Sequence, residues 1–249
     1  MSGSGKTADR RQGRDRQPAR TEGARAGIHR PGGGRRRGSN LRGDRTRRRL
    51  LQAARDELLA RSGHLEVGSV SRRAKVAPSV LYHHFDSKAG LVGEVVGAFY
   101  QRLHTEVLDH DPGAVGDWFA RERERARRGV RFHYGEPLAP VVYGPLSRDP
   151  GVASIEGRAI TAAIDRTGHE IERAQRAGEL PRGVDSALAA AAIFGAMRQL
   201  LAEAMSRARR PREALVVERL WLVSAAAVAQ SGDGKPARRS RAKPRGRAR

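Results

Sequence analysis

The sequence contains no cysteine, and aromatic residues make up only 4% of its 249 residues. Without cysteine the chain can form neither a disulfide framework nor a thiolate metal site or nucleophile. A core with few aromatics must rest on leucine, valine, isoleucine and alanine, which favours helices. No continuous run of about 18 apolar residues is present, and no apolar segment follows the basic N-terminus as it would in a secretory signal. We therefore expect a cytoplasmic protein with no membrane partner.

Acidic residues are much scarcer than basic ones, and the imbalance is concentrated at the two ends of the chain. The formal net charge is +22. Residues 1–43 hold 12 Lys/Arg and 3 Asp/Glu, residues 231–249 hold 8 and 1, and residues 44–230 hold the other 29 and 23. Both ends are also poor in apolar residues, so we expect two disordered basic tails that attract a polyanion.

Sequence patterns typical of catalysis or metal binding are also missing. There is no nucleophile elbow and no dinucleotide fingerprint. The histidines lack the carboxylate or histidine spacing of a zinc site, and His83 and His84 are adjacent, so they would point about 100° apart on a helix. We expect no enzyme activity, no metal and no cofactor, and an enzyme on a helical scaffold is only a remote alternative.

The apolar residues that are present follow a helical period from Arg45 onward, and Gly63 gives a stop signal. A short helix fits residues 67–75, and a second short helix opens at Pro78, a residue suited to the first helical turn. Ser87 can cap the helix that follows. A helix, a short helix, a tight turn and another short helix are the order of a helix-turn-helix unit.

The remaining apolar pattern predicts further helices and no strand. An all-α fold is therefore expected, with an N-terminal three-helix helix-turn-helix DNA-binding domain at 44–91 and a C-terminal helical domain at 92–230. The second domain is expected to bind an effector and to dimerise. Its long helices are predicted to start after Ser87 and near residues 114, 152, 185 and 212, and Pro137, Pro140 and Pro145 restrict the segment between the second and third to brief or kinked turns.

With these helices placed, the sequence resembles the TetR family of transcriptional regulators over about forty-five residues. The residues that carry the resemblance are Ala53, Ala54, Leu58, Leu59, Gly63, Val67, Val70, Ala74, Val76, the run Leu81-Tyr82-His83-His84-Phe85, Ser87, Lys88 and Leu91. The rest of the chain resembles the family only in layout, with Gly178-Glu179-Leu180-Pro181 as the best local match. The resemblance implies a homodimer that binds a pseudo-palindromic operator on double-stranded DNA, usually as a repressor, and releases it when a small molecule enters the C-terminal domain.

Several side chains are expected to contact DNA if the helix at 78–85 enters the major groove. Ser79 and Val80 lie at its leading end, although Val80 can equally pack inside the unit. Tyr82 and His83 match family positions that meet the backbone or base edges. Basic side chains at nearby helix starts and surfaces are candidates for phosphate contacts: Lys88, Arg47, Arg72 and Arg73.

The turn before the recognition helix departs from the family pattern. Lys75 stands where glycine is usual and would have to adopt a left-handed conformation at some cost. Ser71 replaces a usual alanine, and Ala77 cannot cap the helix with a side-chain oxygen. Pro78 partly compensates. These changes bear on the base contacts more than on the fold.

Two sets of apolar residues in the second domain are candidate binding residues. The middle helices supply candidates for an effector pocket that would take a mainly apolar ligand, with Tyr143 or an arginine at one polar end: Phe99, Leu103, Trp118, Phe119, Phe132, Val142, Tyr143, Ile164 and Met197. The last two helices carry a broad apolar face that we expect to form a homodimer, the alternative being that it fills the chain's own core: Leu188, Ile193, Ala196, Met197, Leu200, Leu215, Leu220, Val223 and Ala227.

Two functions from different classes follow. The first is a ligand-responsive DNA-binding regulator that recognises its operator through residues 78–88. The alternative is a non-specific nucleic-acid-binding or compaction protein that acts through its Arg-rich tails, and its affinity would then fall steeply with salt. Binding by the chain without its tails separates the two.

Overall fold

The computed structural model describes residues 34–109 and 116–229, with side chains from Leu41 onward. Every regular element in these ranges is helical, which confirms the prediction of an all-α fold. The elements are α1 (Gly34–Ala60), α2 (Val67–Ala74), α3 (Pro78–Phe85), α4 (Lys88–Leu103), a π-helical turn η1 (His104–Leu108), α5 (Trp118–Gly135), α6 (Ala139–Tyr143), a 3-10 turn η2 (Pro145–Arg148), α7 (Pro150–Ala177), α8 (Ser186–Ser206) and α9 (Glu213–Val228).

The first helix begins earlier than the sequence pattern predicted. α1 starts at Gly34, so residues 34–43, which we assigned to the N-terminal tail, are helical. Arginine has a good helix propensity, and extending an existing helix costs far less than nucleating one. The rest of the predicted N-terminal tail, at 1–33, and the C-terminal tail predicted at 231–249 lie outside the described residues.

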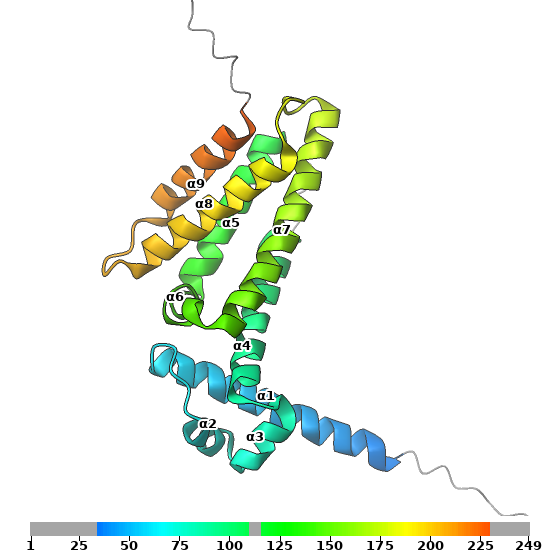
Figure 1. Cartoon of the computed structure of the whole chain (residues 1–249), viewed down its shortest axis with the longest axis vertical. Helices are drawn as coiled ribbons and strands as arrows, with labels where there is room; N and C mark the ends of the chain where they lie inside the picture. The colour runs from blue at the N-terminus through cyan, green and yellow to red at the C-terminus, as the bar shows by residue number, and fades with distance from the viewer. Residues whose placement is uncertain (1–33, 110–115, 230–249) are drawn as a thin grey trace, which may run out of the picture. The chain divides into compact units, whose positions relative to one another are not determined.

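The helices α1, α2 and α3 pack into a small unit around buried aliphatic residues and one phenylalanine. Leu50, Leu58, Val70, Leu81 and Phe85 are all buried there. The stop predicted at Gly63 is present: its backbone lies in the left-handed region, with φ of +91°, and its amide donates to the carbonyl of Leu58. The helix-turn-helix order expected from the sequence is therefore the order of the structure (Figure 1).

Helix α4 connects this unit to a bundle formed by α5, α7, α8 and α9 (Figure 1). Its buried residues include Val95, Val96 and Phe99, and η1 continues it to Leu108. In the bundle α8 packs against α7 and α9, and α5 packs against α9. The long helix α7 ends at Gly178, whose backbone is left-handed with φ of +80°.

Helix α8 is the one described element whose length and composition would allow it to cross a membrane. The sequence contains no continuous apolar run of this length, so the apolar composition of α8 requires a structural explanation. Its residues Ile193, Phe194 and Leu201 are buried in the bundle, and its Arg198 is paired with Glu156 of α7. These contacts explain its apolar composition as that of a helix in a protein core.

Candidate nucleic-acid interface and ligand cavity

The turn between α2 and α3 is built without the glycine and the side-chain cap that usually serve such turns. Lys75 takes the left-handed conformation (φ 54°, ψ 49°), as its position required, and its amide donates to the carbonyl of Arg72. Ala77 is extended and provides no side-chain cap, and Pro78 occupies the first turn of α3. The turn therefore keeps its geometry at the cost of a strained lysine backbone.

Helix α3 divides into a buried face and an exposed face. Leu81 and Phe85 are buried, while Ser79, Tyr82 and His83 are exposed. The Tyr82 side chain is 48% exposed, which is unusual for an aromatic residue. Val80 is half-buried. Within the described ranges the side chains of Tyr82 and His83 make no hydrogen bond or ion pair, so they are available to a partner.

The start of α4 lies directly against the end of α3. The Ser87 hydroxyl accepts a hydrogen bond from the amide of Gly90 at 2.9 Å, which confirms the predicted cap. A Cβ atom at position 90 would lie 2.3 Å from the carbonyl oxygen of Phe85, so only glycine fits there. Lys88, the first residue of α4, is exposed beside this junction. Its ammonium and the helix N-terminus can face one anionic group together.

The three candidate arginines differ in the ion pairs and ring contacts that they already make. Arg47 pairs with Glu94 at 2.5 Å and lies over the ring of Phe85, 5.1 Å from its centre, so it fastens α1 to α4 and α3. Arg73 lies 3.9 Å from both Asp56 and Glu57. Arg72 is exposed and makes no ion pair with the described residues. Of the three, Arg72 is therefore the most available to a phosphate.

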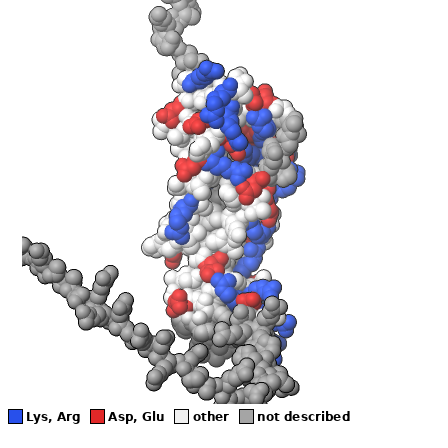
Figure 2. Space-filling model, turned by 90° about the vertical axis from the view of Figure 1, so that its right-hand side faces the viewer, with Lys and Arg blue, Asp and Glu red and all other residues white. Residues whose placement is uncertain are grey.

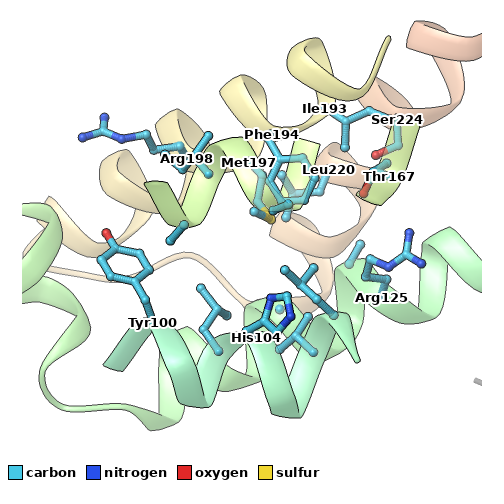
Figure 3. A pocket seen from close by; sticks show the side chains of 18 of the residues that line it. Tyr100, His104, Arg125, Thr167, Ile193, Phe194, Met197, Arg198, Leu220 and Ser224 are labelled. Carbon is cyan, nitrogen blue, oxygen red and sulfur yellow. The ribbon is translucent and has the colours of Figure 1, made fainter. Parts of the chain in front are cut away.

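A cavity lies inside the second region, between α4, η1, α5, α7, α8 and α9 (Figure 3). The cavity volume is about 70 Å³, and the cavity is partly open to solvent. Ile193, Phe194, Met197 and Leu220 form an apolar middle, and Tyr100 with Arg198 lies at the opposite end from Arg125 (Figure 3). The cavity is therefore an apolar chamber with polar groups at both ends.

The structure brings only part of the predicted pocket together. Leu103, Tyr143 and Met197 line the cavity. The other six candidates belong to the cores on either side of it: Phe99, Phe132 and Val142 in one, and Trp118, Phe119 and Ile164 in the other. Those six pack against other side chains because their positions on the helices turn them away from the chamber.

The predicted dimer face also divides. Ile193, Met197 and Leu220 line the cavity of their own chain, and Ile193 and Leu220 are buried there. Leu188, Leu215 and Val223 are exposed, at 70%, 46% and 36%. Ala196, Leu200 and Ala227 are half-buried. Leu222, which the sequence analysis did not select, is 42% exposed on α9.

The charged groups of the cavity form two carboxylate–guanidinium pairs. Arg198 donates to both oxygens of Glu156, from Nε at 2.6 Å and from Nη2 at 3.1 Å. Arg125 donates to Glu122 at 2.6 Å and also bonds Glu170, and Ser224 donates to Glu122 at 3.2 Å. Burial raises the pKa of Glu122, although Arg125 opposes that change. Each charge in the lining therefore has an opposite charge beside it.

Two tyrosines and a buried histidine complete the polar end at Arg198. The Tyr100 hydroxyl is buried and makes no hydrogen bond. The Tyr143 hydroxyl lies 2.9 Å from Nε2 of His133, whose Nδ1 lies 2.6 Å from the carbonyl oxygen of Gly129. Burial lowers the pKa of His133 to about 4 and raises the pKa values of Tyr100 and Tyr143. All three side chains are therefore uncharged at neutral pH.

A separate feature, Glu136 at the C-terminus of α5, joins the two regions. Its carboxylate is buried and accepts hydrogen bonds from Arg55 of α1 at 2.5 Å, from Arg102 of α4 at 2.6 Å and from the amide of Leu138 at 2.9 Å. These bonds lower the pKa of Glu136 despite its burial.

No group of three His, Cys, Asp or Glu residues capable of holding a metal ion occurs in the described part of the chain.

Comparison with known families agrees with the geometry of the first region. The family described as bacterial regulatory proteins, tetR family, matches residues 50–95, the stretch from the middle of α1 to the first part of α4. Residues 50–95 are therefore a DNA-binding region of the TetR family type. This confirms the family suggested by the recognition-helix residues, and it makes the chain a DNA-binding protein of the helix-turn-helix class.

Over the rest of the chain, the similarity to known proteins is mainly one of fold. The transcriptional activator FasR of Mycolicibacterium smegmatis is 28% identical over 170 residues, which cover 56% of this chain and 76% of FasR. The structure of GusR from Salmonella enterica superposes with a TM-score of 0.57 at 21% identity, covering 74% and 95% of the two chains. That of FadR from Bacillus subtilis, solved with stearoyl-CoA, gives 0.59 at 14%, covering 73% and 98%.

The sequence reading of this regulator missed most of the polar cavity residues. Tyr100, Glu122, Glu156 and Arg198 were not selected, because each lies on a helix beside charged surface residues and nothing in the local pattern marks it as buried. One signal was available for Tyr100. Tyr100 directly follows Phe99 in the apolar series of α4. If the apolar stripe of this helix were narrow, position 100 would face solvent, so an aromatic residue there indicates a wider buried face.

Proposed function

We propose that this TetR family member is a dimeric, ligand-responsive repressor that binds a pseudo-palindromic operator through α3. Ser79, Tyr82 and His83 of α3 and Lys88 at the start of α4 are exposed, and this observation carries the DNA-binding part of the proposal. Arg72 supplies a further phosphate contact from α2. The cytoplasm, where the DNA lies, is the proposed compartment.

The response to a ligand is supported by the cavity. An apolar cavity with polar ends is a common form of small-molecule site, and this one lies within the helices that continue from the DNA-binding unit through α4. The FadR structure contains stearoyl-CoA, so a fold of this kind accommodates a long apolar chain. We propose a mainly apolar effector whose binding releases the operator.

Dimerisation is supported by the exposed apolar residues of α8 and α9. The large apolar side chains most exposed in the bundle are Leu188, Leu215, Leu222 and Val223, and all four lie on these two helices. Native mass measurement is expected to give two chains per particle, and Leu188→Glu combined with Val223→Glu is expected to give one. The matched control is Leu41→Glu, an exposed leucine on α1. A monomeric native chain would rule out two-fold operator binding.

Repression is proposed because it needs only occupancy of the operator, which the described residues can provide. FasR carries the name of an activator, so the sign of control has a direct test. Deleting the gene is expected to raise expression of the genes next to the operator. A fall in their expression would instead assign the regulator the role of an activator.

The alternative, compaction of nucleic acid by the tails, makes a different prediction. Figure 2 shows Lys/Arg and Asp/Glu side chains interspersed over the face of the bundle that includes α7, where Arg166 pairs with Glu170 and Arg176 with Glu172. The charge of the described bundle is therefore mixed on this face. A chain lacking residues 1–33 and 230–249 keeps all of α1 and is expected to retain operator preference with weaker non-specific binding. Loss of all binding in this chain would favour compaction.

A further inference from the structure

The polar end of the cavity at Arg198 contains both hydrogen-bond donors and hydrogen-bond acceptors. Four groups meet there: the hydroxyls of Tyr100 and Tyr143, the Glu156 carboxylate and the Arg198 guanidinium. Glu156 is bonded to Arg198, and Tyr100 lies at the same end of the cavity as Arg198 (Figure 3). The hydrogen bonds already made by three of them determine what a ligand can still use.

The Tyr143 hydroxyl can only accept from a ligand. The Gly129 carbonyl has no proton, so Nδ1 of the neutral His133 must be the donor to it at 2.6 Å. Nε2 of His133 then carries no proton and accepts the hydroxyl proton of Tyr143 at 2.9 Å. Because that proton is committed, Tyr143 offers the cavity only the lone pairs of its oxygen.

Tyr100 offers the opposite group. Its side chain is 8% exposed and its hydroxyl is buried, and that hydroxyl makes no hydrogen bond of normal length in the described structure, although the Glu156 carboxylate lies near enough to help raise its pKa. A buried hydroxyl without a partner costs free energy that a ligand acceptor would recover. Tyr100 is thus a ready donor that lies at the end of the chamber (Figure 3).

The remaining pair discourages an anion. Arg198 directs two of its N–H groups at Glu156, whose side chain is 8% exposed, so the guanidinium charge is already balanced. A ligand carboxylate here would meet the charge of Glu156 and the lone pairs of Tyr143. A cationic ligand would meet Arg198. A single neutral group that both accepts and donates satisfies Tyr100, Tyr143 and Glu156 together.

We propose that the effector is a neutral, largely apolar alcohol, whose hydroxyl accepts from Tyr100 and donates to Tyr143 or Glu156 while its carbon skeleton fills the chamber. The skeleton contacts Met197, Phe194, Ile193 and Leu220. The second polar end needs nothing from the ligand, because Glu122 and Arg125 are bonded to each other and to Ser224 and Glu170. The inference rests on the proposed ligand-binding function and specifies its ligand.

The test compares two probes that differ only in the polar group, 1-decanol and decanoate, with the full-length protein and without DNA. Binding is measured by calorimetry and by the shift in melting temperature at equal probe concentration. We expect 1-decanol to bind at least tenfold more tightly than decanoate at pH 7.5. Equal or tighter binding of decanoate overturns the inference, and so does the absence of binding by both probes.

Matched variants identify the group responsible. Tyr100→Phe removes the hydroxyl and keeps the ring, so we expect it to weaken 1-decanol binding about tenfold without lowering the melting temperature of the ligand-free protein. Tyr134→Phe is the control, because the Tyr134 hydroxyl donates to the Pro211 carbonyl and lies outside the cavity lining. Unchanged 1-decanol affinity in Tyr100→Phe contradicts the assignment.

Failure of this inference can be separated from failure of the proposed function. Operator binding by the ligand-free protein does not depend on the outcome with either probe. If decanoate is preferred, the regulator still has a ligand cavity, and only the polar group of its ligand has been assigned wrongly.

Discussion

The polar side chains on the surface of α3 and those that line the cavity differ in their exposure and in their hydrogen-bond partners. On α3 the side chains of Tyr82 and His83 are exposed and have no partner within the described residues. In the cavity Glu156 is bonded to Arg198 and Glu122 to Arg125, so that Tyr100 alone has a buried hydroxyl without a hydrogen bond. An exposed polar group without a partner costs little because water solvates it, whereas a buried charge must be paired. The α3 surface can therefore suit a charged, hydrated polymer and the cavity a neutral small molecule.

The largest expected effect comes from disrupting the contact between the end of α3 and the start of α4. In Gly90→Ala the new methyl group meets the Phe85 carbonyl oxygen at 2.3 Å, and we expect a loss of about 3 kcal/mol in unfolding free energy together with loss of operator binding. Gly97→Ala on the same helix is the control. It has no atom within 4 Å, so we expect it to gain about 0.5 kcal/mol from helix propensity. Chemical denaturation measures both, and two equal changes would contradict the packing account.

The buried His133, which is bonded to the cavity-lining Tyr143, should make the stability of the protein depend on pH. His133 is neutral in the folded protein down to pH about 4, whereas its ordinary pKa is 6.5, so the unfolded chain takes up the proton first. The stability from the neutral ring is complete above pH 6.5 and is lost as the pH falls toward 4, by about 3 kcal/mol. His133→Gln should flatten this part of the stability–pH curve, whereas His169→Gln, at an exposed position on α7, should not. Parallel curves for all three proteins would show that His133 is not buried as described.

The contacts that Glu136 makes with α1 and α4 are expected to contribute to the stability of the protein. Glu136→Gln removes the charge that Arg55 and Arg102 share, and we expect a loss of about 2 kcal/mol because the acceptor is buried. The control is Glu106→Gln, which removes an exposed partner of Arg102 and should cost no more than about 0.5 kcal/mol. Urea denaturation of the two variants measures the difference. Similar losses would mean that Glu136 behaves as an ordinary surface carboxylate.

The smallest of the four effects concerns the exposed face itself. Tyr82→Ala is expected to weaken operator binding about tenfold, or roughly 1.4 kcal/mol, while leaving stability and the dimer unchanged. Fluorescence anisotropy with a labelled operator gives the affinity, and native mass gives the dimer. Unchanged affinity in the folded variant would remove Tyr82 from the interface.

The sequence predicted the DNA-binding region far better than the cavity, and the reason is the range of the contacts. Ser87 caps α4 through Gly90, three residues away, and Leu81 and Phe85 fall on one face of one helix, so local spacing contains the information. Glu156 meets Arg198 across 42 residues, and Arg55 meets Glu136 across 81. Such pairs depend on how the helices pack.

Apolar periodicity has a related limit. It identified Ile193, Met197 and Leu220 as residues that avoid water, and all three are buried or half-buried. It could not tell whether they face a core, a cavity or another subunit, because each of these surroundings has the same preference for apolar side chains. Only the packing of α8 against α7 and α9 assigns them to the cavity.

Selection from a random pool of DNA duplexes tests the central claim most directly, that this regulator recognises sequence through α3. The full-length protein is expected to enrich a two-fold symmetric sequence at a salt concentration that suppresses non-specific binding, and Tyr82→Ala is expected to enrich it much less. Enrichment of no sequence, or the same enrichment by both proteins, would contradict the account.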